Sequence, residues 1–285
     1  MAAGPALVIP APALTPPPNG LLRTATIVEH DDLHFAGALE WSPEGCGSAV
    51  VFNPCTVNAG LGTTRNRASK IRYDAFAVEA HDSCSTYGWE TGDYVGRAQR
   101  ALLARETKAV EAEFWTGALF PANPHLAAAA PPANGGLAAT TVTGVAASLR
   151  NGLALLVQAI ADGNGGIGMI HARPHLVELW WGFDLLYRDA GGRLWTGVGN
   201  PVIPGAGYPG TGPNGEAVSG TSEWAFATDE VVVHRGPVFL PAPNVDAMSV
   251  DYASNEVIGR AERSYALAMN GCVLAAAQIN PTTET

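Results

Sequence analysis

Apolar and polar residues alternate with a period of two from Glu256 to Met269, in the run EVIGRAERSYALAM. Such alternation is typical of a strand that buries one face. The residues expected on that face are Val257, Ala261, Tyr265, Leu267 and Met269. We therefore predict a long strand over 256–269, and we expect the apolar run at 272–279 to extend the same sheet.

The strongest helical pattern runs from about Asp93 to Thr116. This stretch contains no proline, and good helix formers fill its centre. Thr91 or Asp93 can cap its start, and Gly117 stands where a helix would end. Its apolar stripe consists of Val95, Ala98, Leu102, Ala109, Phe114 and Trp115. At about 1.5 Å per residue the helix would be roughly 35 Å long, and we expect it to pack on a sheet through that stripe.

Shorter patterns complete the prediction. Runs rich in β-branched and aromatic residues, bounded by glycine and proline, favour strands. Strands are expected at 24–28, 33–39, 48–52, 70–78, 168–171, 194–197, 223–228 and 230–234, and helices at 142–161 and 175–183. No internal repeat occurs, and the mixture of helices and strands predicts an α+β fold.

The first 58 residues are poor in large apolar side chains. Residues 1–20 have prolines at 5, 10, 12, 16, 17 and 18, which exclude a helix or a sheet interior and favour an extended arm. The short strands expected after it cannot bury their own faces. We therefore expect residues 1–58 to contribute little to the fold of one subunit and much to contacts with its neighbours.

The composition points in the same direction. The chain of 285 residues is 47% hydrophobic but only 15% charged, against about 25% in a typical soluble domain. Because charge keeps a free surface soluble, this deficit indicates a surface covered by partners. The alternative is a sequence that merely favours small residues. The formal net charge of −10 argues against a basic surface for gripping nucleic acid, so a chain that lives near DNA would enclose it.

The four cysteines form no CxxC pair, which argues against a zinc ribbon or a thioredoxin-like motif. Four scattered cysteines are interpreted as reduced thiols of a cytoplasmic protein. A short loop closed by Cys46 and Cys55 is the alternative, and Cys272 is expected to be a small buried hydrophobic residue. The N-terminus lacks a basic secretory leader, and no apolar stretch is long enough to span a membrane, so we expect a soluble protein made in the cytoplasm.

Two pairs of histidines, each four residues apart, are candidate metal ligands. His30 and His34 flank two aspartates, and His171 and His175 flank Pro174. A spacing of four presents two imidazoles together only on a helix. The first pair lies in a region predicted to be extended and proline interrupts the second, so an acidic turn and a strand-end loop are the favoured interpretations.

Other candidate chemistry is equally weak. The glycines Gly163, Gly165 and Gly168 follow a predicted helix and precede a strand, which is the reverse of a dinucleotide-binding fingerprint. They are therefore interpreted as a helix-to-strand turn. Cys84 has His81 three residues away, but one nearby histidine is little support for a thiolate nucleophile. We assign no catalytic, cofactor-binding or metal-binding residue, no cofactor and no enzymatic activity.

The order of the elements is more specific than any one of them. An extended arm, a two-stranded excursion, a long helix (GDYVGRAQRALLARETKAVEAEFWTG), a separate α/β segment and closing strands (VDYASNEVIGRAERSYALAMNGCVLAAAQ) follow one another. This order resembles the HK97-type major capsid proteins of tailed bacteriophages, especially those of actinobacteria. The resemblance implies an N-arm at 1–20, an E-loop at 21–58, a peripheral domain at 59–139 with its spine helix at 93–116, an axial domain at 140–242, and returning peripheral strands at 243–285.

The resemblance also implies a function. Such a chain would assemble as hexamers and pentamers into the icosahedral head shell, made in the host cytoplasm, and enclose double-stranded DNA without sequence-specific or membrane binding. Portal and possibly decoration proteins are implied partners, with a separate scaffold or none. The family's lysine–asparagine crosslink is not carried over, because Lys70 and Lys108 are the only lysines and neither clearly lies in the E-loop. The alternatives are an encapsulin-type nanocompartment shell and an enzyme of unrecognised class.

Overall fold

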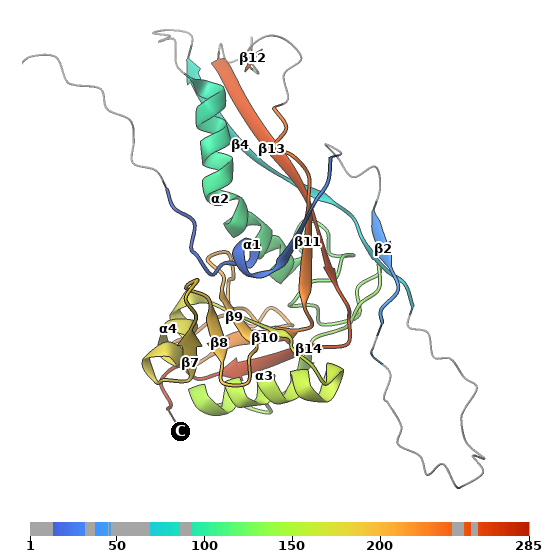
Figure 1. Cartoon of the computed structure of the whole chain (residues 1–285), viewed down its shortest axis with the longest axis vertical. Helices are drawn as coiled ribbons and strands as arrows, with labels where there is room; N and C mark the ends of the chain where they lie inside the picture. The colour runs from blue at the N-terminus through green and yellow to red at the C-terminus, as the bar shows by residue number, and fades with distance from the viewer. Residues whose placement is uncertain are drawn as a thin grey trace, which may run out of the picture.

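A computed structural model describes residues 14–31, 38–44, 46, 69–85, 93–240, 248–251 and 256–284. Within these ranges the chain forms an α+β fold with two large sheets and a two-stranded pair. The helices are α1 (Leu21–Thr24), α2 (Tyr94–Thr116), α3 (Leu149–Asn164) and α4 (Pro174–Gly182). Figure 1 shows α2 and the long strands at one end of the molecule and the second sheet, with α3 and α4, at the other.

The first sheet has five strands in the order β1–β11–β13–β12, with β4 on the other side of β13. Their bounds are β1 (Thr26–Glu29), β4 (Phe76–Ser85), β11 (Val231–Arg235), β12 (Met248–Asp251) and β13 (Glu256–Met269). The antiparallel β4 and β13 pair over ten residues, from Ser85 and Glu256 to Phe76 and Tyr265. The prediction of a strand over 256–269 is confirmed.

The predicted face of β13 is also confirmed for Ala261, Tyr265, Leu267 and Met269, all of which are buried. The side chain of Val257 lies outside the described residues. Helix α2 packs along β4 and β13, as expected for its apolar stripe.

Helix α2 has the predicted ends. The Asp93 carboxylate accepts a hydrogen bond from the Gly96 amide at 2.8 Å, and Gly117 ends the helix in the left-handed conformation with φ 58°. Of the predicted stripe, Ala98, Leu102, Phe114 and Trp115 are buried, whereas Ala109 is exposed and Val95 is only half-buried.

The second sheet has seven strands in the order β5–β14–β10–β6–β9–β8–β7. Their bounds are β5 (Thr140–Thr141), β6 (Met169–Ala172), β7 (Leu186–Arg188), β8 (Leu194–Thr196), β9 (Pro201–Pro204), β10 (Glu223–Thr228) and β14 (Leu274–Ile279). The expectation that 272–279 extends the sheet of β13 is wrong, because β14 pairs with β10 and β5 here. Four residues between β13 and β14 suffice to carry the chain from one sheet to the other.

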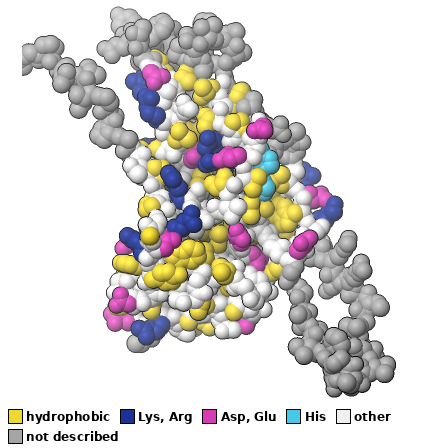
Figure 2. Space-filling view, viewed as in Figure 1, with side chains coloured by type: hydrophobic (Ala, Val, Ile, Leu, Met, Phe, Trp, Pro, Cys, Tyr) yellow, Lys and Arg dark blue, Asp and Glu magenta, His cyan; other side chains and the backbone are white. Residues whose placement is uncertain are grey.

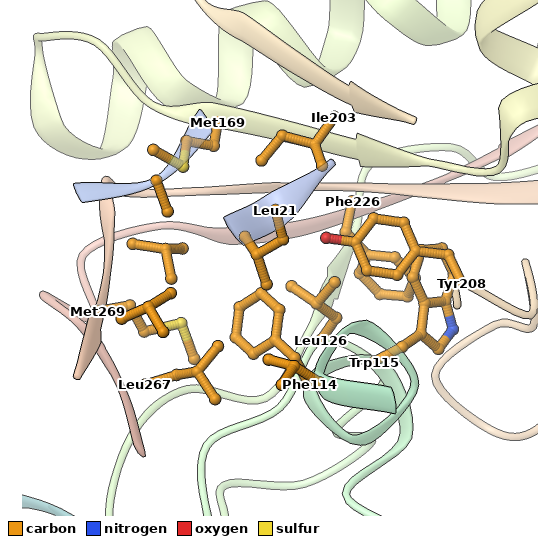
Figure 3. Packing of buried hydrophobic residues seen from close by; sticks show 14 of the residues in the cluster. Leu21, Phe114, Trp115, Leu126, Met169, Ile203, Tyr208, Phe226, Leu267 and Met269 are labelled. Carbon is orange, nitrogen blue, oxygen red and sulfur yellow. The ribbon is translucent and has the colours of Figure 1, made fainter. Parts of the chain in front are cut away.

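The seven-stranded sheet is buried on both faces. Ala225 and Ala227 of β10 pack with α3 and α4, whereas Trp224 and Phe226 face the opposite core, which also contains the C-terminal turns of α2. Figure 3 shows this core, with Leu21 of α1 between Phe114 of α2 and residues of the seven-stranded sheet. Other members of the core are Trp115, Leu126, Met169, Ile203, Tyr208, Leu267 and Met269.

The N-terminal segment is therefore part of the subunit core. Leu21 is fully buried, Leu22 and Ala25 are nearly so, and β1 pairs in parallel with β11. This contradicts the expectation that residues 1–58 contribute little to the fold of one subunit. Two leucines at the end of a proline-rich arm give no periodic signal, so the sequence does not reveal that they are buried.

Several boundaries also differ from prediction. The stretch 70–78 contains two strands, β3 (Ile71–Tyr73), which pairs with β2 (Leu39–Trp41), and the start of β4. Helix α3 begins at Leu149 behind a Ser148 cap, later than the predicted 142. The strand expected at 48–52 and most of that at 33–39 lie outside the described residues.

Candidate functional site

Of the two candidate histidine pairs, the structure describes both members of one, His171 and His175, and these do not form a ligand pair. His30 Nε2 lies 2.9 Å from Nδ1 of His234 on the neighbouring strand, and His34 lies outside the described residues. His171 lies on β6 and His175 on α4. Pro174 does not interrupt a helix but starts one, because proline at the first helical position lacks only an amide that has no helical partner.

His171 is a buried structural residue. Its Nε2 lies 2.9 Å from Thr228 Oγ1 and its Nδ1 lies 2.9 Å from the Tyr208 hydroxyl. Because the Thr228 hydroxyl donates to the Asp229 carbonyl, Nε2–H donates to Thr228 and Nδ1 accepts from Tyr208. Burial lowers the pKa of His171 to about 3, so the imidazole is neutral.

The remaining candidates are also accounted for. Gly165 ends α3 with φ 64°, and a Cβ on Gly168 would lie 2.2 Å from the Thr228 carbonyl, so these glycines form the predicted helix-to-strand turn. His81 is exposed on β4 opposite Arg260, and the Cys84 side chain lies outside the described residues. Within the described ranges, no cluster of three or more His, Cys, Asp or Glu residues could hold a metal ion.

One open groove of about 490 Å³ lies beside the turn between β13 and β14. Its lining combines apolar residues (Trp41, Ile167 and Met269) with acids (Glu44, Asp229 and Glu230). Two of these acids, Glu44 and Glu230, are exposed at the groove beside the third, Asp229, which is buried. Extensive side-chain hydrogen bonding among the described residues occurs at three junctions between elements.

The first junction is organised by Glu111, a carboxylate of α2 that is fully buried. Its Oε1 accepts a hydrogen bond from the Leu21 amide at 2.9 Å, and its Oε2 accepts one from the Gly207 amide at 2.9 Å. The Ala206 amide adds a third donor. One side chain thus joins the N-terminal segment, the long helix and the loop that follows β9.

The close approach at this junction requires glycine. A Cβ on Gly207 would lie 2.0 Å from the Lys108 carbonyl and 2.8 Å from Cβ of Glu111. Any larger residue would therefore push the loop away from α2 and lengthen its hydrogen bond to the carboxylate. Burial raises the pKa of Glu111 to about 7, although the three amide donors lower it.

The second junction joins α2 to β13. Glu106, 6% exposed, accepts two hydrogen bonds from Arg263 at 3.1 and 3.2 Å and one from the Tyr265 hydroxyl at 2.7 Å. Both contacts from Arg263 come from Nη1, so each oxygen of the buried carboxylate has a donor, whereas Nε of Arg263 is buried without a hydrogen-bond partner among the described residues. Burial, reinforced by the Glu106 carboxylate, raises the pKa of the Tyr265 phenol, so this group remains a donor.

The third junction lies at the turn between β13 and β14. Asp229 Oδ2 accepts from the amides of Cys272 and Val273 at 2.6 and 2.9 Å, and Trp41 Nε1 donates to the Met269 carbonyl at 3.0 Å. Cys272 forms a disulfide with Cys46, across 226 residues of sequence. The prediction of four reduced thiols is wrong for these two, and the alternative Cys46–Cys55 pairing is excluded.

Sequence reasoning missed these junctions for identifiable reasons. Glu106 and Glu111 lie at buried positions of α2. A carboxylate between apolar positions of a helix is the one sequence feature that could have predicted a buried hydrogen-bonded junction. Cysteines 226 residues apart carry no signal in sequence spacing.

Comparison with known proteins supports the architecture. No protein-family model matches the sequence, and no curated protein matches it. Solved structures do match over nearly the whole chain. The capsid of a native GTA particle is 13% identical, with a TM-score of 0.58 over 98% of this chain and 95% of that one.

Two further structures agree. The encapsulin complex of Synechococcus elongatus PCC 7942 is 13% identical, with a TM-score of 0.56 over 99% of this chain and 94% of its own. A structure from Mycobacterium phage Adephagia is 13% identical, with a TM-score of 0.53 over 98% and 94%. The chain therefore has the HK97-type fold that is shared by phage capsid and encapsulin shells.

Proposed function

We propose that this chain is a major capsid protein that assembles into the closed head shell of a bacteriophage and encloses its DNA. The observation that carries the proposal is the extent of the structural match. Capsid and encapsulin subunits superpose on 98–99% of the chain, and the chain covers 94–95% of them. One fold that is also found in shell-forming proteins thus extends over nearly the whole chain.

The subunit itself supports the proposal. The five-stranded sheet is covered by α2 on one face, while the opposite face of β4 presents exposed Ala77, Glu79, His81 and Ser83. Such a long, thin end gains little stability from its own core. In a shell, neighbours would cover part of this surface, which fits a chain with only 15% charged residues.

The finer assignments belong to the same proposal. The N-arm is proposed at 1–20, the E-loop at 21–58, the peripheral domain at 59–139 and 243–285, and the axial domain at 140–242. The subunit would form hexamers and pentamers in the host cytoplasm and act with portal, scaffold and possibly decoration proteins. It would have no cofactor and no catalytic or metal site. No described helix is long and apolar enough to cross a membrane.

Electron microscopy of the purified protein, alone and with the products of neighbouring genes, tests the proposal. Closed shells with hexameric and pentameric units are expected. A strictly monomeric protein that binds a small ligand tightly would contradict it. The match to an encapsulin makes a protein-filled nanocompartment the second candidate, and shells that contain cargo protein and no nucleic acid would favour it.

A further inference from the structure

Helix α2 buries its acidic residues and exposes its basic ones. Its acids Glu106 and Glu111 are 6% and 0% exposed and point into the protein. Glu113 is half-buried and accepts from the backbone amides of Leu119 and Phe120. The basic residues of the helix, in contrast, are all exposed, and they are Arg97, Arg100, Arg105 and Lys108. No exposed carboxylate lies within α2 itself.

These cations share one side of the helix. At about 100° per residue, Arg97, Arg105 and Lys108 fall within roughly a quarter turn of one another, and Arg100 lies about 60° outside that arc. The positions between them are Ala101 and Ala104, which are partly exposed, and beyond Lys108 the loop at Gly207 packs against Ala112. The row from Arg97 to Lys108 extends about 16 Å along the axis, and short side chains between the cations leave it open to a long, straight partner.

The cations are only weakly neutralised within the subunit. Arg97 pairs with Asp82 at 2.7 Å and Arg100 with Asp93 at 3.2 Å, both at the surface. Such exposed pairs contribute about 0–1 kcal/mol and can be exchanged for other anions. Neither Arg105 nor Lys108 has a salt bridge to the described residues. The whole chain has only 16 basic residues against 26 acidic ones. A helix face with four exposed cations and no exposed acid of its own therefore has the opposite charge balance to the chain as a whole.

We propose that this face of α2 contacts the phosphate backbone of the enclosed nucleic acid, an inference that rests on the proposed shell function. Duplex DNA has about one charge per 1.7 Å of its axis when both strands are counted, so a length of about 16 Å carries roughly ten phosphates, of which those on the near side are within reach. Contacts of arginine and lysine with phosphate are independent of sequence. Because the cations are few and the chain as a whole is acidic, each subunit would bind the nucleic acid weakly. Such contacts would keep the nucleic acid close to the inner surface of the shell without binding it at a fixed position.

The chain permits a direct test, because Lys108 is one of its only two lysines. Shells filled with DNA and shells emptied of it are treated with acetic anhydride, and acetylation of each lysine is measured by mass spectrometry. Lys108 is expected to be modified several-fold more slowly in filled shells. Lys70, which pairs with Glu40 at the base of the β2–β3 pair, is the internal reference and should react equally in both.

Each outcome is decisive. Equal acetylation of Lys108 in filled and empty shells would overturn the inference and leave the shell function intact. Protection of Lys108 only in DNA-free particles that retain an acidic protein would assign this face to that protein instead. Failure to form shells at all would overturn the proposed function and the inference with it.

The salt dependence of DNA binding, compared between two double variants that each lose two cations, gives a second test. Arg105→Gln with Lys108→Gln removes two cations from the α2 face, and Arg150→Gln with Arg193→Gln removes two exposed cations elsewhere. Binding of a short DNA duplex to dissociated subunits is measured against salt concentration. The α2 variant is expected to reduce the slope of log K against log salt by about 1.8, at about 0.9 per contact, and the control to change it little. Equal reductions by both variants would contradict a specific role of α2.

Discussion

Every residue of β6, β9 and β10 in the seven-stranded sheet is buried, whereas β4 in the five-stranded sheet alternates between covered and exposed positions along its length. The seven-stranded sheet lies between two large hydrophobic clusters. Over its outer half, the five-stranded sheet is backed by a small cluster of Ala98, Leu102 and Ala261. Figure 2 shows the narrow end with hydrophobic and charged side chains interspersed over its surface.

The difference in burial between the two sheets indicates which part of the chain is stable without partners. Burial of apolar surface contributes roughly 25 cal/mol per Å², so a sheet covered on both faces is stable by itself, and a sheet covered on one face gains less. We expect the seven-stranded end to be the last to unfold and the outer part of the five-stranded end to be the part that neighbours must stabilise.

The largest effect is expected from removing the N-terminal segment. A chain that begins at Thr63 loses Leu21, Leu22 and β1, which lie in the core between the two ends. Since losing one buried leucine side chain costs about 2–5 kcal/mol, this chain should not fold stably. A chain that begins at Leu14 keeps every described contact and is the control. Circular dichroism and thermal melting compare them, and a stable, folded Thr63 chain would restore the view that these residues act only between subunits.

A substitution in the small cluster should affect the five-stranded end alone. Leu102→Asp places an unpaired charge at a position 1% exposed, next to Ala98 and Ala261, and should cost several kcal/mol. Leu103→Asp, at a position 40% exposed, is the matched control and should be nearly neutral. Hydrogen exchange should show lost protection in β4 and β13 but not in β10. Equal loss of protection in both sheets would show that the two ends unfold as one unit.

Reduction of the disulfide should have an intermediate effect. The bond closes a loop of 226 residues between the segment after β2 and the turn after β13. Breaking it with a reductant, or by Cys272→Ser, should lower the free energy of unfolding by about 2–4 kcal/mol. Cys55→Ser leaves the bond intact and should melt like the wild type. An unchanged melting temperature under reductant would show that the bond contributes nothing to stability.

The smallest effect is a dependence on pH. Burial raises the pKa of Glu111 from 4.5 to about 7, so the folded state binds a proton more tightly than the unfolded state. The associated stability is therefore fully present below pH 4.5 and is lost as pH rises through 7, by up to about 3 kcal/mol. Glu111→Gln, which has no titratable proton, should abolish this part of the dependence. A wild-type profile that is flat between pH 5 and 7, matching that of the variant, would refute the role of Glu111.

Local patterns predicted the local elements well. The period of two in β13 and the helical stripe of α2 are clearest where each element faces one neighbouring layer, as at Ala98, Leu102 and Ala261, so this periodicity is visible in the sequence. Pairing between distant segments leaves no such record. The short apolar strand β14 fits either sheet by composition, and only packing against β10 decides where it lies. The Glu111 junction depends on a backbone loop 96 residues away.

The short connection at Asp229 constrains how the two ends can move. Only Asp229 and Glu230 separate β10 from β11, and the Asp229 carboxylate also holds the turn from β13 to β14 through the Cys272 and Val273 amides. Two of the three passages of the chain between the large sheets thus meet at Asp229, and the third is the segment 117–139 between α2 and β5. Sliding of one sheet past the other would disturb both passages at Asp229 together, whereas rotation about Asp229 would strain the contacts of Glu111 and the hydrophobic core that the two sheets share. In the proposed shell, such a rotation would change the angle between the two sheets of a subunit while Asp229 keeps their connections together.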